Sequence, residues 1–388
     1  MLAGLYTDDC SPVVDWLKNA QPEVAARCIV ESGAHCPAPT LEQLRALWTP
    51  RLTNLKNDPE PKARAAVGRA LGRLKLSGLP LDNRKGVSIF SPLLRSPTAS
   101  SRLAVGSART RTASARDLPG LLRKDPAGLT LPDLDWLEIP SGPFIYQEDD
   151  KRTEPTFYLA RYPITYAQFQ TFIDDADGFA NPRWWEGLAA SDEHKRAPGE
   201  QAFKFATHPR ERVSWYDAIA FCRWLTEMAH THPQLLPETL RGKGHCEITL
   251  PTEWQWEKAA RGPLPSPVAS LTGEGPGVRA YPYGKTFDAA KANTNETSIG
   301  QTSTVGIFPN GASPYSVLEL SGNVWEWCLN EYEKPINIGL SGSADRVVRG
   351  GSWGGYEDFA RAASRFRLVP DYRDDGIGFR VCVRPTSL

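Results

Sequence analysis

Two short stretches in the C-terminal part of the chain, GNVWEW at residues 322–327 and RGGSW at residues 349–353, decide how the sequence is interpreted. Both place tryptophan beside glycine and charged residues. Large aromatic side chains dominate the energetics of a core, and paired glycines give the backbone freedom at a turn. The 33 prolines and 32 glycines in 388 residues agree with many turns. The two stretches therefore predict a loop-rich domain anchored by tryptophans.

Four further motifs accompany these two in a fixed order: RYPIT at 161–165, VSWYDA at 213–218, LPTEWQWE at 250–257 and GFR at 378–380. Together the six motifs closely resemble the formylglycine-generating-enzyme (sulfatase-modifying factor) superfamily. The resemblance spans about residues 133–384. It implies an α+β fold of the C-type-lectin-like, formylglycine-generating-enzyme type, loop-rich and preceded here by a small helical region.

Local signals predict three helices in this domain. Thr165 and Thr252 are each followed three residues later by glutamine, which is the spacing of a capping box, and Ser214 can cap a third helix. Gly262 is expected to end the helix that Thr252 begins. Five tryptophans of the motifs are expected to fill the core, namely Trp254, Trp256, Trp325, Trp327 and Trp353.

The chain divides into three regions. Residues 1–80 carry apolar side chains at three- and four-residue steps and predict a helical appendage of HEAT-like hairpins, docked on the next domain or left from a longer array. Residues 81–130 are rich in serine, proline and arginine without periodicity, and predict a flexible linker. Residues 131–388 form the lectin-like domain.

Bulk properties restrict the partners. The 45 basic residues equal the 45 acidic ones, so a globally basic nucleic-acid binder is disfavoured. No window is long and apolar enough for a membrane span, and the first residues lack a secretory signal, which predicts a cytoplasmic protein. The seven cysteines are scattered without a CxxC pair. We expect an unknown protein or surface ligand as the partner.

Two catalytic branches of the superfamily lack their residues here. Formylglycine-generating enzymes use two cysteines just beyond the Gly-Gly-Ser turn, and residues 353–361 contain none. The iron-dependent sulfoxide synthases use a histidine triad that draws mostly on an N-terminal helical bundle, where this chain offers only His35. His230 and His232 lie at a predicted helix end. We therefore predict that the protein is not an enzyme, a metal-dependent oxidase being the less favoured alternative.

Between residues 354 and 376 two kinds of position interleave. One kind is dominated by alanine and arginine. The other mixes aromatic, aliphatic, glycine and aspartate residues without any helical or strand period, which resembles the variable region of diversity-generating-retroelement variable proteins. The predicted ligand-binding residues are Gly354, Gly355, Tyr356, Phe359, Ser364, Phe366, Leu368, Val369, Tyr372, Asp374, Asp375 and Gly376.

The resemblance also implies a calcium site on the loop that ends in GNVWEW. Its ligands by position are Glu319, the carbonyls of Gly322 and Val324, and Glu326. No cofactor is expected to be required, and Ca²⁺ is the one to test. The favoured function is a non-catalytic ligand-binding protein that displays a diversified C-terminal surface. The alternative is an accessory domain of a signalling or defence protein.

Overall fold

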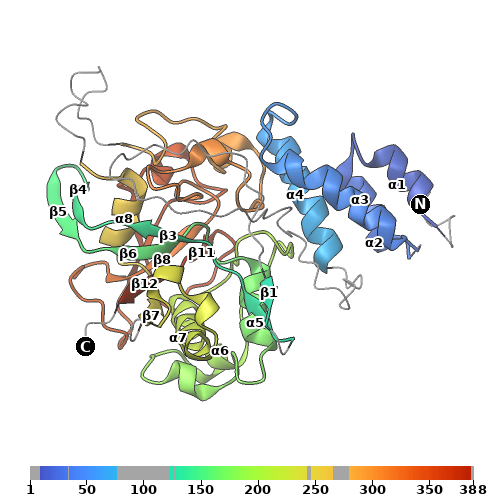
Figure 1. Cartoon of the computed structure of the whole chain (residues 1–388). Coiled ribbons are helices and arrows are strands. Elements are labelled where there is room, and N and C mark those ends of the chain that lie inside the picture. Colours follow the sequence, from blue (N-terminus) through green and yellow to red (C-terminus); the bar gives the residue numbers. More distant parts are fainter. Residues whose placement is uncertain are drawn as a thin grey trace, which may run out of the picture.

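A computed structural model describes residues 9–33, 35–76, 122–125, 128–242, 246–264 and 279–385. They form a helical unit and a larger domain of helices, short strands and long loops (Figure 1). The predicted α+β class is confirmed. Most of the predicted linker lies outside the described residues.

In its described residues the helical unit contains four α-helices, and each has a proline in its first turn, where a missing N–H costs nothing. Trp48 is fully buried among them, and its indole donates to the carbonyl of Lys18 at 2.8 Å. The helices are α1 (Ser11–Leu17), α2 (Pro22–Glu31), α3 (Ala38–Trp48) and α4 (Pro61–Leu76).

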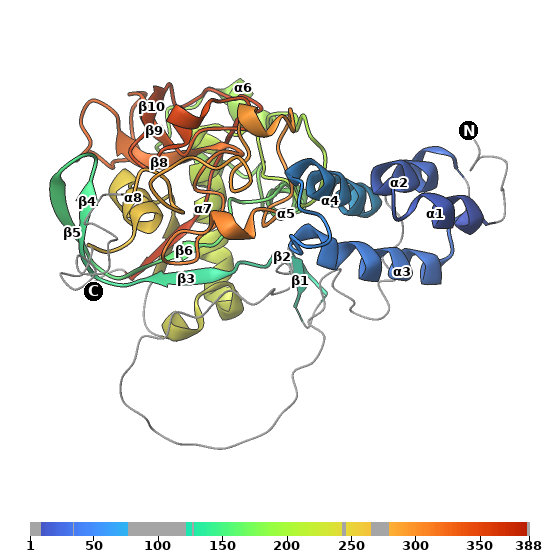
Figure 2. The same ribbon diagram turned by 90° about the horizontal axis from the view of Figure 1, so that it is seen from above.

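Helix α4 packs directly against the larger domain (Figure 2). A Cβ atom on Gly68 would lie 2.1 Å from Thr304 Oγ1, so only glycine allows this approach. The guanidinium of buried Arg64 donates to the carbonyl of Ile307 at 2.8 Å. The helical unit is therefore fixed to the domain by backbone contact as well as by apolar packing.

In the part of the domain that the structure describes there are two four-stranded sheets and two hairpins. The first sheet has the order β3-β6-β12-β7, which places the last strand of the chain in its middle. Its strands are β3 (Trp136–Ile139), β6 (Phe157–Ala160), β7 (Cys246–Thr249) and β12 (Cys382–Pro385). The hairpins are β1 (Leu122–Lys124) with β2 (Thr130–Pro132), and β4 (Gly142–Tyr146) with β5 (Asp150–Glu154). Because β1 lies within residues 81–130, the end of the predicted linker belongs to the folded domain.

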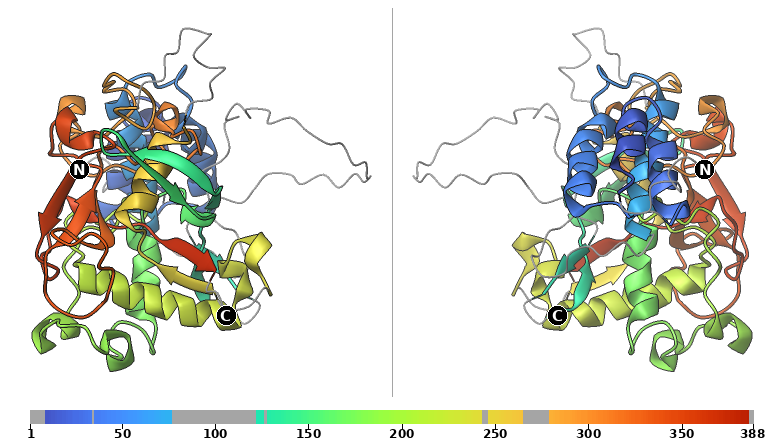
Figure 3. Two further views of the ribbon diagram at one scale, coloured as in Figure 1. Left: turned by 90° about the vertical axis from the view of Figure 1, so that its left-hand side faces the viewer. Right: turned by 90° about the vertical axis from the view of Figure 1, so that its right-hand side faces the viewer.

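The second sheet has the order β10-β9-β8-β11, and β11 pairs with β8 in parallel. Figure 3 shows its orange-red strands at the margin of the domain. Its strands are β8 (Trp325–Glu331), β9 (Arg346–Arg349), β10 (Arg365–Leu368) and β11 (Ile377–Gly378). The Gly350-Gly351 turn leaves β9, and Gly351, at φ 74°, lies so close to the backbone of Phe359 that a Cβ would be 3.0 Å from it.

The three predicted helices are confirmed, with their caps. Thr165 and Thr252 form capping boxes with the predicted glutamines, Ser214 accepts from the N–H of Asp217, and Gly262, at φ 84°, ends the last helix. The α-helices of the domain are α5 (Tyr166–Asp174), α6 (Asp192–Arg196), α7 (Trp215–Thr231) and α8 (Glu253–Arg261). Short 3₁₀ helices are η2 (Thr49–Leu52), η3 (Pro182–Trp185), η4 (Pro233–Leu235), η5 (Glu238–Leu240), η7 (Asn295–Thr297), η8 (Pro309–Gly311) and η9 (Glu357–Ala360).

The prediction that the five tryptophans fill the core is only partly right. Trp256 and Trp327 are fully buried, and the Trp327 indole donates to the carbonyl of Val213 at 2.9 Å. Trp254, Trp325 and Trp353 are only half-buried. The partly exposed tryptophans are therefore available for roles other than core packing.

We expect Trp327→Ala to lower the free energy of unfolding by about 3–5 kcal/mol, because it opens a cavity and removes a buried hydrogen bond. Chemical denaturation would measure the change. Trp16→Ala is the matched control, since the Trp16 side chain is 75% exposed and its loss should cost little. Equal effects of the two substitutions would contradict this account of the core.

Candidate functional site

Exposed apolar side chains gather on the stretch that follows the Gly-Gly turn. Nine large apolar residues in the described part of the chain are strongly exposed, and five of them lie between residues 354 and 376. They are Tyr356 at 61%, Phe359 at 46%, Phe366 at 50%, Val369 at 49% and Tyr372 at 42%. Concentrated exposure of this kind marks an interaction site more often than scattered apolar residues do.

The half-buried indole of Trp325 connects two of these residues. Its ring lies 6.1 Å from that of Phe359, in an edge-to-face arrangement, and 6.0 Å from that of Phe366. Because Trp325 begins β8 and Phe366 lies on β10, with β9 between them, the cluster spans three of the four strands of the sheet. We call the five exposed residues together with Trp325 the aromatic face.

The other predicted binding residues differ in exposure. Gly354 is exposed, whereas Leu368 packs against the main core. Gly376 is buried, and its carbonyl accepts from the N–H of Trp325 at 2.7 Å, so its place is in the scaffold. The remaining four are half-buried, namely Gly355, Ser364, Asp374 and Asp375.

Positions between the displayed residues hold the stretch to the domain. Ala360, Ala362 and Pro370 are buried. Arg373 donates to both carboxylate oxygens of Asp217 at 2.8 and 2.7 Å, which ties the loop after β10 to the first turn of α7. Burial by itself would raise the pKa of Asp217, but hydrogen bonds from His194 and Arg373 hold it below its usual value.

His194, Ser214 and Asp217 include the residue types of a hydrolytic triad, but their geometry differs. The same ring nitrogen, Nε2 of His194, lies 2.8 Å from the Ser214 hydroxyl and 3.4 Å from Asp217. A triad needs the serine and the carboxylate on opposite nitrogens of the ring. The Ser214 hydroxyl also serves as the cap of α7. This cluster is therefore structural.

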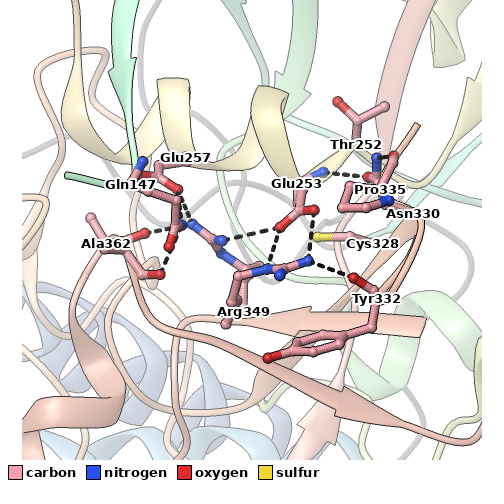
Figure 4. Close-up of polar contacts among 12 residues, drawn as sticks. Gln147, Thr252, Glu253, Glu257, Cys328, Asn330, Tyr332, Pro335, Arg349 and Ala362 are labelled. Carbon is pink, nitrogen blue, oxygen red and sulfur yellow. Dashed lines mark hydrogen bonds and ion pairs between the residues drawn. The ribbon is translucent and has the colours of Figure 1, made fainter. Parts of the chain in front are cut away.

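A buried ion network joins helix α8 to the sheet that carries Trp325 and Phe366, and Figure 4 shows its central residues Arg349, Glu253 and Glu257. Arg349 of β9 lies between two carboxylates of α8, 3.4 Å from Glu253 and 2.5 Å from Glu257, and all three side chains are fully buried. Arg365 of β10 donates to both oxygens of Glu253 at 2.9 and 3.0 Å, and Arg261 donates to Glu257 at 2.6 Å. The network joins α8 to β9 and to β10, the strand that carries Phe366.

No described cysteine is placed as a reactive thiol beside the Gly-Gly turn. Cys328 and Cys382 lie on inner strands, and both are fully buried. Burial raises the pKa of Cys382 to about 12, which keeps the thiol protonated. Within the described ranges, no three His, Cys, Asp or Glu side chains converge as metal ligands do.

The residues implied for calcium do not fit a cation. Glu326 is fully buried and accepts from Arg380 on both oxygens at 2.6 Å, and from the Trp256 indole at 2.7 Å. Glu319 accepts from the N–H of Gly306 and the amide of Asn323. N–H donors thus occupy the oxygens that would face the metal, and burial raises the pKa of Glu319 to about 7.

We accordingly expect millimolar Ca²⁺ or a chelator to leave the thermal midpoint unchanged, since a ligand stabilises only the state that binds it. Differential scanning fluorimetry at neutral pH would measure this. MgCl₂ at the same concentration controls for ionic strength. An upward shift of the midpoint that is specific to Ca²⁺ and abolished by Glu326→Gln would restore the calcium site.

Comparison with known proteins identifies the family of the domain. A family model for the sulfatase-modifying factor enzyme 1-like domain (FGE-sulfatase) matches residues 125–385, which is most of the chain and includes both sheets. The chain belongs to this family. Its loop-rich mixture of short strands and capped helices is the C-type-lectin-like fold expected from the motifs.

Two relatives with different names match about half of this chain. Hercynine oxygenase of Mycolicibacterium smegmatis is 26% identical over 260 residues, covering 55% of this chain and 53% of that protein. The mouse protein named inactive C-alpha-formylglycine-generating enzyme 2 is 30% identical over 212 residues, covering 51% of this chain and 56% of that protein. The chain therefore spans about half the length of each.

Among solved structures, Treponema denticola variable protein 1 matches with a TM-score of 0.44 and 20% identity, over 64% of this chain and 95% of that one. Separately, none of the helices described is long and apolar enough to cross a membrane.

Sequence reasoning missed the tryptophans at the site. Trp325 was expected in the core, yet it contributes to the aromatic face. Trp353 was expected there too, but it is half-buried, with its ring 5.7 Å from Phe203 and its indole donating to the carbonyl of Asp375. No local signal marks them, because the motif around a tryptophan does not tell how deeply the fold will cover it.

Removing the central cation of the ion network tests its role. We expect Arg349→Met to lower the free energy of unfolding by about 3–5 kcal/mol, because two buried carboxylates lose their shared partner. The matched control is Arg361→Met, whose side chain is 50% exposed, pairs with exposed Asp358 and lies 6.0 Å from the Tyr281 ring. Chemical denaturation of both variants distinguishes a network that stabilises the fold from one that does not.

Proposed function

We propose that the protein is a non-catalytic ligand-binding protein whose aromatic face engages a partner. The observation that carries this proposal is the gathering of five of the nine strongly exposed apolar side chains on one stretch, over a rigidly held sheet. Rigid aromatic rings provide contact area at low entropic cost, as they do in antibody paratopes.

The chemistry of the same region supports binding over catalysis. Residues 353–361 contain no cysteine, and the side chains of the aromatic face include no titratable group other than the two tyrosine hydroxyls. A relative in the family is named as inactive, so the family already includes a protein described as having lost its activity. We propose further that the interleaved positions diversify while the buried alanines and inward-turned arginines stay fixed.

A binding selection tests the function. With the whole chain as bait, a displayed library of small protein domains should yield binders, and these should lose at least about tenfold in affinity for the variant with Tyr356, Phe359, Phe366 and Tyr372 all changed to serine. Trp16→Ser/Val24→Ser removes exposed apolar residues on the helical unit and is the matched control. Binders that ignore the quadruple variant would reject the aromatic face as the site.

The quadruple serine variant should also remain folded. Each substitution at these exposed positions is expected to change stability by no more than about 0.5 kcal/mol, against several for Trp327→Ala. Thermal unfolding of the two variants side by side measures this. A quadruple variant as unstable as Trp327→Ala would mean that these aromatics are structural.

The proposal also predicts that the protein has no formylglycine-generating activity. We expect no aldehyde on a cysteine-containing sulfatase peptide incubated with the protein, oxygen and copper(I), because the two reactive cysteines have no counterpart here. Mass spectrometry of the peptide detects the mass change. Aldehyde formation above that of a protein-free control would overturn the non-catalytic assignment, whether or not Cys328→Ser and Cys382→Ser abolish it.

A further inference from the structure

The outer edge of β10 is open. This strand is the last in the order β10-β9-β8-β11 and pairs only with β9. In an antiparallel pair, alternate residues turn their N–H and C=O groups away from the partner strand. Within the described residues, no turn, loop or side chain hydrogen-bonds to the backbone of residues 365–368 from that outer side. Main-chain donors and acceptors therefore face outward beside the aromatic face.

An edge of the other sheet is closed by a specific contact. β7 is its last strand, and the hydroxyl of Thr226 on α7 accepts from the N–H of Ile248 at 3.0 Å and donates to its carbonyl at 3.1 Å. An open edge invites pairing with another chain, and folded proteins usually cover it. The fold thus covers β7 with a helix but leaves β10 uncovered next to exposed aromatics.

The two sides of β10 differ in chemistry, because successive side chains of a strand point to opposite faces. On one side, Phe366 is half exposed and lies against Trp325. On the other side, the guanidinium of Arg367 lies 5.6 Å from the Tyr332 ring, 2.6 Å from Glu333 and 3.9 Å from Asp345. A strand added to this edge would meet an apolar surface on one side and a charged, aromatic one on the other.

Arg367 is available to a new partner. Its side chain is 55% exposed, and its two carboxylate partners, Glu333 at 2.6 Å and Asp345 at 3.9 Å, are 72% and 35% exposed, so both ion pairs are reached by water and contribute little. The guanidinium of Arg365, by contrast, is turned inward to buried Glu253. Arg367 is therefore the cation of β10 that can exchange its present carboxylate for one supplied from outside.

We propose that the outer edge of β10 binds an extended segment of a partner protein by strand addition, and that this segment alternates apolar and acidic side chains. The apolar side chains would cover Phe366 and Trp325, and an acidic one would pair with Arg367. Main-chain hydrogen bonds provide affinity in this mode, and the alternating side chains provide specificity. The inference rests on the proposed function and deepens it, since it identifies the partner of the aromatic face as a peptide backbone.

The probe is a fluorescent peptide, acetyl-Thr-Val-Glu-Val-Glu-Val-Thr-amide, titrated with the whole protein by fluorescence anisotropy. We expect saturable binding that weakens at least about tenfold when alternate peptide amides are N-methylated, because N-methylation removes the main-chain donors. Lysine in place of both glutamates should also weaken binding about tenfold. A second peptide, N-methylated on the other alternate set of amides, controls for which edge of the peptide faces β10.

Reversing the charge of Arg367 tests whether the peptide binds at β10. Arg367→Glu should reverse the preference, so that the lysine peptide binds more tightly than the glutamate peptide. Arg361→Glu is the matched control, because Arg361 is also exposed on this stretch but lies outside the strand, and it should leave the preference unchanged. Circular dichroism establishes that both variants are folded. A merely structural role of Arg367 would lower affinity for both peptides without reversing their order.

Three results would overturn strand addition: no saturable binding of any peptide, equal binding of all N-methylated forms, or a preference that Arg367→Glu does not change. The proposed function is judged separately by the displayed-library binders. Binders that require Tyr356 and Tyr372 but ignore Arg367→Glu would keep the aromatic face as a binding site and reject the open edge as its mechanism.

Discussion

The fully buried guanidinium of Arg349, held between Glu253 and Glu257, is the interaction on which the displayed surface depends. The two carboxylates lie one helical turn apart on α8, and Arg365 and Arg261 pair with Glu253 and Glu257 at either end of the network. Removing one partner from such a buried network costs far more than removing a surface pair. Strands β9 and β10 are thereby fixed to a helix through charge as well as through apolar packing.

This arrangement separates the residues that hold the surface from those that form it. Along residues 354–376, alanine, proline and inward-turned arginine make the contacts to the domain, while the aromatic side chains between them reach solvent. A side chain in the second group can change without disturbing the first, because its atoms make few contacts within the fold. Contacts that hold the fold and side chains that reach solvent are therefore assigned to different positions of one continuous segment, which is the arrangement that the proposed binding role requires.

Local features of the fold could be predicted from the sequence, whereas the strand order and the burial of individual side chains could not. The helices that begin after Thr165 and Thr252 could be predicted, because a capping box involves only four consecutive residues. The position of β12 between β6 and β7 depends on residues far apart in the chain, and no local spacing records it. Trp325 and Trp327 lie two residues apart and share a side of β8, yet only Trp327 lies where the core covers it completely. The displayed stretch was recognisable because it lacked any period, but its open edge follows only from the order of the strands.

The close approach of α4 at Gly68 fixes the orientation of the helical unit relative to the domain. Because backbone meets side chain there without space for even one added methyl group, the helical unit cannot swing relative to the domain while that contact lasts. The helical unit and β10 lie on different sides of the domain (Figure 2), so the angle between them is set by the fold. Were several copies gathered through their helical units, their aromatic faces would stand at a fixed spacing. A target that repeats with the same spacing would then be held by avidity, and one with a different repeat would not.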